Sequence, residues 1–490
     1  MNLLKRIPDR PAANWLIMLV MATAIMMLLS RDSYLYLLGP RCDSAWFFMC
    51  GKAWMNGMVP YVDFADSKGP LLWLIYGVGY LLSHYDYHGV FWVSVVVYSG
   101  TFYFLFKTAR LFVAQRSQAL LAVLLTSVAI FNPITHDETR AEDFGMFFAA
   151  LSLWQLCRIL YVEHTERDER IAFFAFGISL AGTLLIKYNI TAMCCIFPAI
   201  GLYHLLRERG NVWRPLLACA AGFAALSLPF LICFLIHGNF SAFIQEYFIN
   251  TLQTIKVRDG RSSLLSFSYG NLRGFFSNRI LAIVLFCLGL FCLGVSNCIK
   301  RAYCYVPSVL IVLSFIAINY SSNWVYYYKI LMIYGIWMAL YLLIKYHRFD
   351  RLYWIVGFLG TGALFWNSLY MPCSINDSIM SKEYDAMERC FAGKKDIKVL
   401  YFGMENGFGI TANSLPACKY WSRQNRATEE MIKNNEDCAI NHLCDYVFLD
   451  LNREYTHDCA KLLEQYNYEK IHTMYYHNDK YMDVYALKQE

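Results

Sequence analysis

Long apolar runs fill most of the sequence and predict a membrane protein. A helix needs roughly 20 mainly apolar residues to cross a bilayer. About eleven runs approach that length, and we expect each of them to form a spanning helix. They cover residues 13–29, 89–106, 119–132, 144–161, 171–186, 190–206, 216–236, 280–295, 305–318, 326–344 and 352–369. The pattern therefore predicts an α-helical polytopic membrane protein.

One shorter apolar run, residues 70–82, departs from this pattern. Its length is about half to two-thirds of what a crossing requires. We therefore predict an interfacial or re-entrant helix here, within a first outer loop of residues 31–88.

Charged residues in the loops predict the orientation in the membrane, because short cytoplasmic loops are rich in Lys and Arg. With the N-terminus in the cytoplasm, every predicted inner loop is basic. The residues concerned are Lys107, Arg110, Arg116, Arg158, Arg167, Arg170, Arg207, Arg209, Arg214, Lys300, Arg301, Lys345, Arg348 and Arg351. If residues 70–82 formed a full crossing, every later loop would change sides and these basic residues would lie outside. We therefore do not count residues 70–82 as a spanning helix. An odd number of spans then places the C-terminal tail on the outer face.

The tail is more polar than the rest and predicts a separate domain. We expect a transmembrane domain at residues 1–370, with a long outer loop at 237–279, and a small soluble extracytoplasmic α/β domain at 371–490. The expected elements of the tail are strands at 397–402 and 446–451, a helix at 459–466, and a hairpin of 471–476 with 481–487.

The net charge and the N-terminal segment give further information about the class of membrane protein. The net charge of +6 lies mainly in short loops, so we attribute it to orientation and not to a nucleic-acid partner. Lys5, Arg6 and Arg10 precede the first apolar run, as in a signal peptide, but no clear small-x-small cleavage site follows. We expect a retained first span.

The 17 cysteines fall into two groups. Those inside apolar runs are expected to behave as small hydrophobic residues. The tail has Cys373, Cys390, Cys418, Cys438, Cys444 and Cys459. An even number in a small soluble region fits disulfides in an oxidising compartment, with the pairing open. None has the CxxC spacing of a zinc site.

Ionisable residues gather in the first outer loop, where Asp43, Asp63, Asp66 and Lys68 lie between apolar segments. Ionisable groups beside a bilayer are costly and mark functional sites. The predicted outer face also receives the polar segment 136–143 and Lys187. The sequence therefore predicts a polar site on this face.

The first outer loop resembles that of GT-C type membrane glycosyltransferases, which include protein O-mannosyltransferases and lipid A aminoarabinose transferases. The matching elements are Asp43, the aromatic segment 46–54, Asn56-Gly57, Pro60-Tyr61, Asp63 with Asp66, and Lys68-Gly69-Pro70-Leu71-Leu72. Further along, Glu142 resembles a second-loop acidic position and Lys187 a Lys at the outer end of a later span. Tyr326-Tyr327-Tyr328 resembles the His-Tyr-Phe type motif that opens a late span, although Tyr stands where His is more usual.

The resemblance implies transfer of a sugar from a polyprenyl-phosphate donor to a hydroxyl of an extracytoplasmic lipid, glycan or protein acceptor, with inversion. It implies Asp43 as general base and Glu142 as a second acidic group, with Glu138 and Asp143 as alternatives to Glu142. The implied contacts of the donor phosphate are Lys68, Arg140 and Lys187, and possible substrate-binding residues are Tyr61, Asp63, Asp66 and Tyr327. A divalent metal is compatible with the carboxylates, but Asp43 is followed by Ser44 where a second acid is often found.

Each candidate also has a structural alternative. Asp43 suits a helix N-cap, and Asp63 and Asp66 suit a turn. Lys68 and Lys187 suit membrane-edge anchors, and the tyrosines suit an aromatic belt.

Two other functions compete with sugar transfer. One is a multi-span transporter or flippase for a lipid-linked or polar solute, although the spans show few mid-depth charges and no evident repeat. The other is a non-catalytic assembly partner with the tail as a binding module. For a transferase, the expected location is a bacterial inner membrane, with the site and the tail on the periplasmic side.

Overall fold

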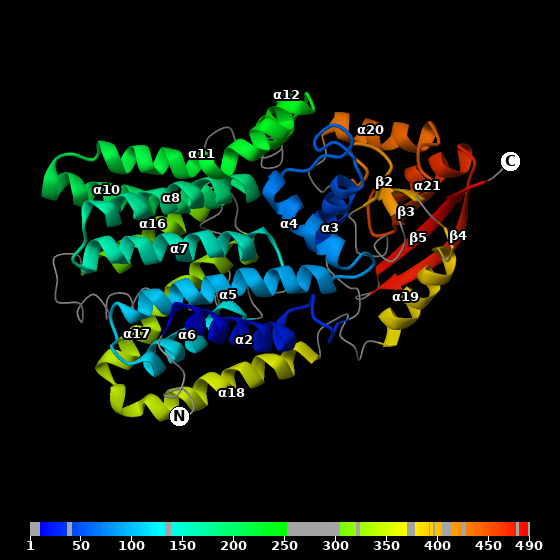
Figure 1. Ribbon diagram of the computed structural model, residues 1–490. Coiled ribbons are helices and arrows are strands. Elements are labelled where there is room, and N and C mark those ends of the chain that lie inside the picture. Colours follow the sequence, from blue (N-terminus) through cyan, green and yellow to red (C-terminus); the bar gives the residue numbers. More distant parts are fainter. Residues whose placement is uncertain are drawn as a thin grey trace. The chain divides into compact units, whose positions relative to one another are not determined.

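A computed structural model of the chain shows a mainly helical protein with one small β-sheet (Figure 1). The structure describes residues 10–36, 42–132, 139–251, 304–319, 324–369, 378–391, 393–394, 397–403, 414–423, 428–476 and 480–488. The chain divides into two compact units. The first comprises Met1–Leu29, Ser94–Phe230 and Arg261–Trp366, and the second Ser30–Val93, Leu231–Gly260 and Asn367–Glu490.

The first unit is a helical bundle. Its helices are α2 (Pro11–Leu29), most of α5 (His88–Arg110), α6 (Arg116–Ile130), α7 (Ala141–Tyr161), α8 (Glu166–Ile186), α9 (Tyr188–Cys194), α10 (Ile196–Arg209), most of α11 (Trp213–Ile236), α16 (Val306–Asn319), the 3₁₀ helix η2 (Val325–Tyr334), α17 (Gly335–Lys345), the short 3₁₀ helix η3 (His347–Phe349) and most of α18 (Asp350–Leu369).

The predicted spans are confirmed as helices wherever the structure describes them. Ten of the eleven apolar runs are helical, and the run at 280–295 lies outside the described residues. Among the described helices, eight are long and apolar enough to cross a membrane, while α6 and α16 are shorter. The protein is therefore an integral membrane protein.

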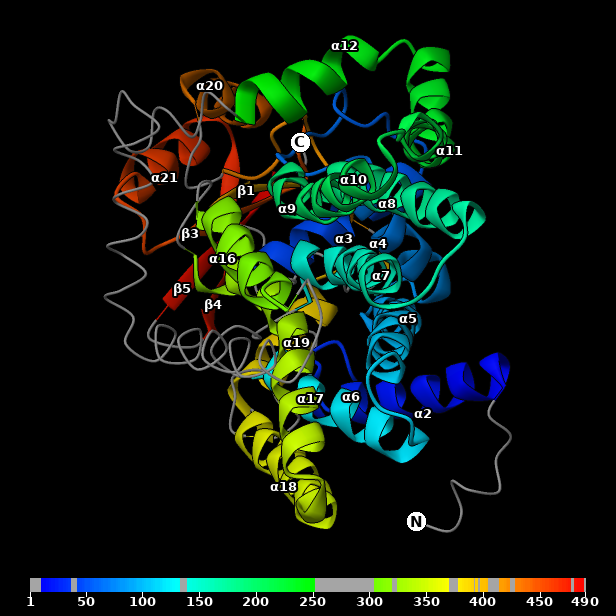
Figure 2. The ribbon, with the colours of Figure 1, turned by 90° about the vertical axis from the view of Figure 1, so that its left-hand side faces the viewer.

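Helix α7 is the most buried of these eight helices, and α8 and α10 pack against it (Figure 2). The 3₁₀ helix η2 also packs against α7. Only 17% of the apolar window of α11 or α18 is buried, as expected for helices that contact lipid. Gly177 of α8 and Gly222 of α11 lie directly against backbone of the facing helix. Small residues let membrane helices approach closely. Close packing is important here because no hydrophobic force drives helices together in lipid.

The second unit begins with two packed helices, α3 (Cys42–Met55) and α4 (Pro70–Leu82). The predicted short helix at 70–82 is confirmed as α4, with 13 residues and Pro70 in its first turn. Gly51 and Gly77 lie at the crossing, where a Cβ on Gly51 would come within 2.5 Å of Gly77 N. This unit also contains the end of α11, α12 (Phe240–Phe243) and the π-helix η1 (Ile244–Asn250).

The tail forms a five-stranded sheet in the order β2-β1-β3-β5-β4 (Figure 1). The strands are β1 (Ile397–Phe402), β2 (Ser414–Pro416), β3 (Tyr446–Asp450), β4 (Tyr468–Tyr476) and β5 (Lys480–Leu487), and the helices of the tail are α19 (Ser378–Phe391), α20 (Glu429–Ile440) and α21 (Thr456–Gln465). Strands β2, β1 and β3 run parallel, whereas β5 is antiparallel to β3 and β4. The predicted small sheet domain is confirmed, and β2 was missing from the prediction.

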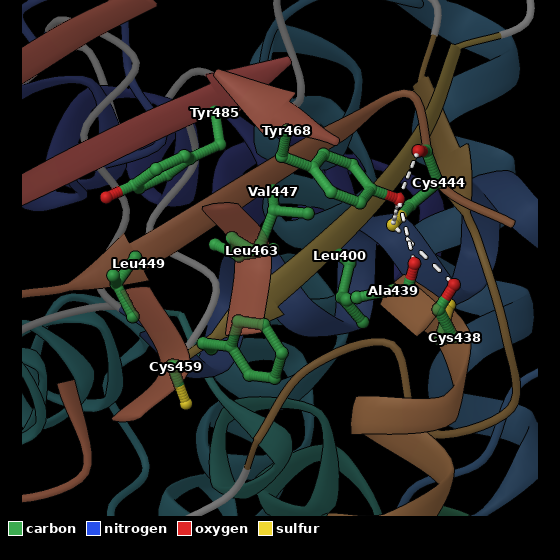
Figure 3. Packing of buried hydrophobic residues seen from close by; sticks show 11 residues of the cluster. Leu400, Cys438, Ala439, Cys444, Val447, Leu449, Cys459, Leu463, Tyr468 and Tyr485 are labelled. Carbon is green, nitrogen blue, oxygen red and sulfur yellow. Dashed lines mark hydrogen bonds between the residues drawn. The ribbon is translucent and has the colours of Figure 1, made fainter. Parts of the chain in front are cut away.

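The described tail cysteines are free thiols, so the disulfide expectation is wrong for them. They are Cys390, Cys418, Cys438, Cys444 and Cys459, whereas Cys373 lies outside the described residues. Cys438, Cys444 and Cys459 belong to the apolar core beneath the sheet (Figure 3). Tyr468 joins this core, and its hydroxyl lies 3.1 Å from Cys444 Sγ. These thiols are therefore packing groups.

Candidate functional site

Four predicted site residues meet around the N-terminal end of α7. Arg140 directly precedes this helix, and its backbone N–H donates to Asp143 Oδ2 over 2.9 Å. In return the Asp143 N–H donates to the Arg140 carbonyl over 3.1 Å. These two bonds fix the first turn. The side chain of Glu142 starts from this turn and is buried.

Glu142 and Lys187 form a buried ion pair. Lys187 Nζ donates to Glu142 Oε1 over 2.6 Å, and the two side chains are 7% and 2% exposed, respectively. Lys187 occupies the single-residue break between α8 and α9, where its backbone is extended. The break lets a lysine from the end of one helix reach the start of another. Within the described part of the chain, Glu142 Oε2 is buried and has no hydrogen-bond partner.

Two tyrosines cover the two cations. Lys187 Nζ lies 3.6 Å from the centre of the Tyr327 ring, and Arg140 Cζ lies 3.7 Å from the centre of the Tyr326 ring. A cation over an aromatic face is attracted by the negative charge on that face, most strongly where water is excluded. Arg140, Glu142, Lys187, Tyr326 and Tyr327 are called the α7-head cluster below. The cluster places two cations and one carboxylate in a partly dry aromatic surrounding.

A second buried ion pair lies next to this cluster, and the sequence-based prediction did not include it. Asp143 Oδ1 accepts from Lys329 Nζ and from the Tyr98 hydroxyl, and both charged side chains are at most 2% exposed. The available signal was a single lysine inside the apolar run at 326–344. These bonds occupy Asp143 and leave Glu142 as the carboxylate with an open oxygen. Glu138, the other alternative, lies outside the described residues.

The remaining predicted residues belong to the second unit. Asp63 Oδ2 accepts from the Val59 N–H over 2.6 Å and so closes a tight turn. Asp66 Oδ1 accepts from the Ser67 N–H over 2.5 Å and from its hydroxyl over 3.2 Å. This is the local bonding for which turns favour Asp.

Tyr61 and Lys68 belong to the same segment of the second unit. Tyr61 is fully buried with a positive φ of 65°, and its hydroxyl donates to the Lys68 carbonyl over 2.9 Å. Lys68 Nζ donates to Ser67 Oγ over 3.1 Å and lies 5.5 Å from the centre of the Phe47 ring. The lysine is only partly buried, so its ammonium group keeps access to a ligand.

Asp43 lies in the first turn of α3 and is half-buried. The partial positive charge at a helix N-terminus stabilises a carboxylate in this position. The same placement suits a helix-capping role and a general base.

Glu246 is a further buried carboxylate of the second unit that was absent from the predicted site. It lies in η1, and its Oε1 accepts from Tyr420 over 2.9 Å and from Lys419 over 2.5 Å. Burial, followed by the neighbouring Glu246 charge, raises the pKa of Tyr420, so this hydroxyl stays a donor. Asp66 and Glu246 both line a cavity of about 20 Å³, roughly the room for one water. The π-helical backbone that places Glu246 left no pattern in the sequence.

The comparisons with known proteins agree with the resemblance seen in the sequence. Residues 67–246 match the family described as dolichyl-phosphate-mannose-protein mannosyltransferase. This stretch contains Lys68, Arg140, Glu142 and Lys187. No curated protein matches the chain.

Solved structures support the fold. The structure of ArnT from Cupriavidus metallidurans bound to undecaprenyl phosphate matches with a TM-score of 0.61 and 10% identity, over 98% of this chain and 100% of that chain. The Archaeoglobus fulgidus oligosaccharyltransferase gives 0.46 and 13% identity over 95% and 72% of the two chains. The arabinofuranosyltransferase AftD from Mycobacteria gives 0.48 and 11% identity over 97% and 40%.

The predicted resemblance to GT-C type membrane glycosyltransferases is therefore confirmed. The match of residues 67–246 to the mannosyltransferase family indicates a glycosyltransferase enzyme, and the likeness to ArnT shows the fold.

Proposed function

We propose that the protein transfers a sugar from a polyprenyl-phosphate donor to a hydroxyl group of an extracytoplasmic lipid, glycan or protein, with inversion at the anomeric carbon. The α7-head cluster is the observation that carries this proposal. It brings two cations and an open carboxylate oxygen together inside the stretch that matches the mannosyltransferase family. The ArnT structure with bound undecaprenyl phosphate supports the choice of donor.

Arg140 and Lys187 are the proposed contacts of the donor phosphate, together with Lys68. The bond from the anomeric carbon to the phosphate oxygen breaks during transfer, and negative charge grows on the departing lipid phosphate. Cations held in place before the reaction stabilise that charge without having to reorganise. Tyr326 and Tyr327 lie with their ring faces against the two cations, and Lys187 also pairs with Glu142.

Asp43 is the proposed general base. It takes the proton of the acceptor hydroxyl while the acceptor oxygen bonds to the anomeric carbon and the lipid phosphate leaves. Such proton transfer is worth roughly 10²–10⁴-fold in rate. Glu142 is the proposed second acidic group, with Oε1 holding Lys187 and Oε2 available to a sugar or acceptor hydroxyl. Asp63, Asp66, Tyr61 and Tyr327 remain proposed substrate-binding positions.

The test is transfer from a panel of radiolabelled polyprenyl-phosphate sugars in membranes that contain the full chain. Wild-type protein is expected to label a lipid, glycan or protein product, and Asp43→Asn is expected to abolish labelling. Asp86→Asn is the matched control, because this outer-loop carboxylate bonds to Ser83 and the His88 backbone and has no proposed role in transfer. Full activity of Asp43→Asn would refute the proposed base.

A further inference from the structure

We propose that the first unit contains a zinc site formed by His164, His204 and Glu208, with Glu169 beside it. The site lies where the connection from α7 to α8 meets the last turns of α10. One nitrogen or oxygen from each of His164, His204 and Glu208 lies within 4.8 Å of the others. All of these residues belong to one compact unit.

The side chains are held in a largely buried place. His204 and Glu169 are buried, at 3% and 6% side-chain exposure, and His164 is 10% exposed. Glu208 is 46% exposed and closes the cluster toward solvent. Because α7, α8 and α10 pack together, the cluster joins three elements of the bundle (Figure 2).

The hydrogen bonds of the imidazoles support metal binding. A metal-ligating histidine normally bonds through its other ring nitrogen to a carbonyl or carboxylate, which fixes the tautomer and ring orientation. His164 Nδ1 lies 3.0 Å from the Val162 carbonyl, so this nitrogen carries the proton and Nε2 keeps its lone pair. His204 likewise bonds to the backbone of Ile159.

The distances between the donor atoms leave room for one ion. Two ligands that each lie about 2.1 Å from a tetrahedral zinc ion are about 3.4 Å apart. His204 Nε2 lies 3.4 Å from Glu208 Oε2, and the donor atoms of His164, His204 and Glu208 all lie within 4.8 Å of one another. The first separation matches neighbouring positions on one zinc ion and exceeds the usual length of a charge-assisted hydrogen bond.

The chemical types of these ligand atoms favour zinc over the other common metal ions. Two imidazoles and a carboxylate are a known zinc ligand set, whereas calcium and magnesium prefer oxygen ligands alone. Arg209 Nη1 lies 3.0 Å from Glu169 Oε1 and forms an ion pair with this carboxylate beside the site. The α7-head cluster is at the other end of α7, roughly 30 Å away along its 21 residues. We assign this zinc a structural role, in which it fixes the connection from α7 to α8 against α10.

The test is the zinc content of the full chain, purified with an affinity tag that contains no histidine. The protein is stripped with a chelator, refilled with zinc, desalted and analysed by inductively coupled plasma mass spectrometry. Wild-type protein is expected to keep one equivalent of zinc. Glu208→Gln and the double variant His164→Ala/His204→Ala are expected to bind zinc at least roughly tenfold more weakly.

The controls separate loss of zinc from loss of fold. His237→Ala removes an exposed histidine at the end of α11 and is expected to keep the wild-type zinc content. Because Glu208 is half-exposed, we expect Glu208→Gln to fold normally. This variant therefore tests the site even if the double variant unfolds. Zinc is also expected to raise the melting temperature of stripped wild-type protein and to leave that of Glu208→Gln unchanged. The proposal would be overturned if wild-type protein held no zinc after refilling, or if wild type and Glu208→Gln held equal amounts of zinc. In either case the cluster would be a histidine–glutamate ion-pair network.

Discussion

For the pair of Glu142 and Lys187, the contribution to folding can be separated from the proposed contribution to catalysis. Removing one charge leaves the other buried without its partner, which typically costs 3–5 kcal/mol, whereas replacing both charges with neutral groups is often tolerated. We therefore expect Lys187→Met to lose both stability and sugar transfer.

The double variant Glu142→Gln/Lys187→Met distinguishes the two contributions. It is expected to recover most of the lost melting temperature, because no unpaired charge remains. Transfer is expected to stay at least roughly 100-fold below wild type, because the proposed phosphate contact and second acid are both absent. Melting curves and the labelled-donor assay on the same preparations provide the measurement. A stable double variant with wild-type turnover would show that the pair only supports the fold.

Cys459 predicts how stability depends on pH. Burial raises the pKa of this thiol to about 11, from an ordinary value of 9.0. Between these values the unfolded chain loses the proton while the folded chain keeps it, so the free energy of unfolding falls as the pH rises. The melting temperature of wild-type protein is therefore expected to fall between about pH 9 and 11, more steeply than that of Cys459→Ala. Equal slopes would contradict this expectation.

At the residue scale, the sequence pointed to most of the α7-head cluster but not to its pairings. Glu142, Arg140 and Lys187 stand out because each lies next to an apolar run. The choice between Glu142 and Asp143 depends on which carboxylate meets Lys329, and that lysine lies 186 residues further along the chain. Partner choice at such a separation is a property of packing and leaves no local pattern.

At the scale of elements, the crossing of α3 and α4 depends on glycine. A Cβ on Gly51 would lie 2.5 Å from Gly77 N and 2.8 Å from the Trp73 carbonyl, which are backbone atoms that cannot rotate away. Gly51→Ala is expected to force the helices apart and to cost roughly 1–3 kcal/mol of stability. Melting of the purified protein in detergent measures the change.

Gly362→Ala is the matched control for this substitution. Gly362 is also in a helix, α18, but an added Cβ would meet no atom within 4 Å in the described structure. Alanine is there expected to leave stability unchanged or to raise it slightly, since glycine is the weaker helix former. Equal losses at the two positions would show that the close approach of α3 and α4 is not what matters.

Hydrophobic length and periodicity predicted the apolar helices and four of the five strands, but not the tail helices α19 and α20. They were insufficient for β2, a three-residue strand that pairs only with β1. They also did not predict the π-helix that carries Glu246 or the 3₁₀ form of the segment that carries Tyr326 and Tyr327. These local distortions depend on contacts with other elements and are not encoded in the local pattern of apolar residues.

At the scale of the whole molecule, the distribution of basic loops predicts the topology. The loop at Gly210, beside Arg207 and Arg209, is expected in the cytoplasm, and the tail is expected outside. Alkaline phosphatase, which folds only in an oxidising compartment, is expected to be active when fused after residue 490 and inactive when fused after Gly210. The reverse pattern would overturn the orientation and with it the extracytoplasmic site.

The strand order of the tail also determines when its sheet can form during synthesis. Strand β5 follows the other four described strands in the chain, yet it lies between β3 and β4. Until β5 has been made, β3 has an open edge and β4 has no partner strand among the described residues. Unpaired edges of this kind invite pairing with other chains. The sheet can therefore be completed only after β5 has been made, and until then its open edges favour aggregation.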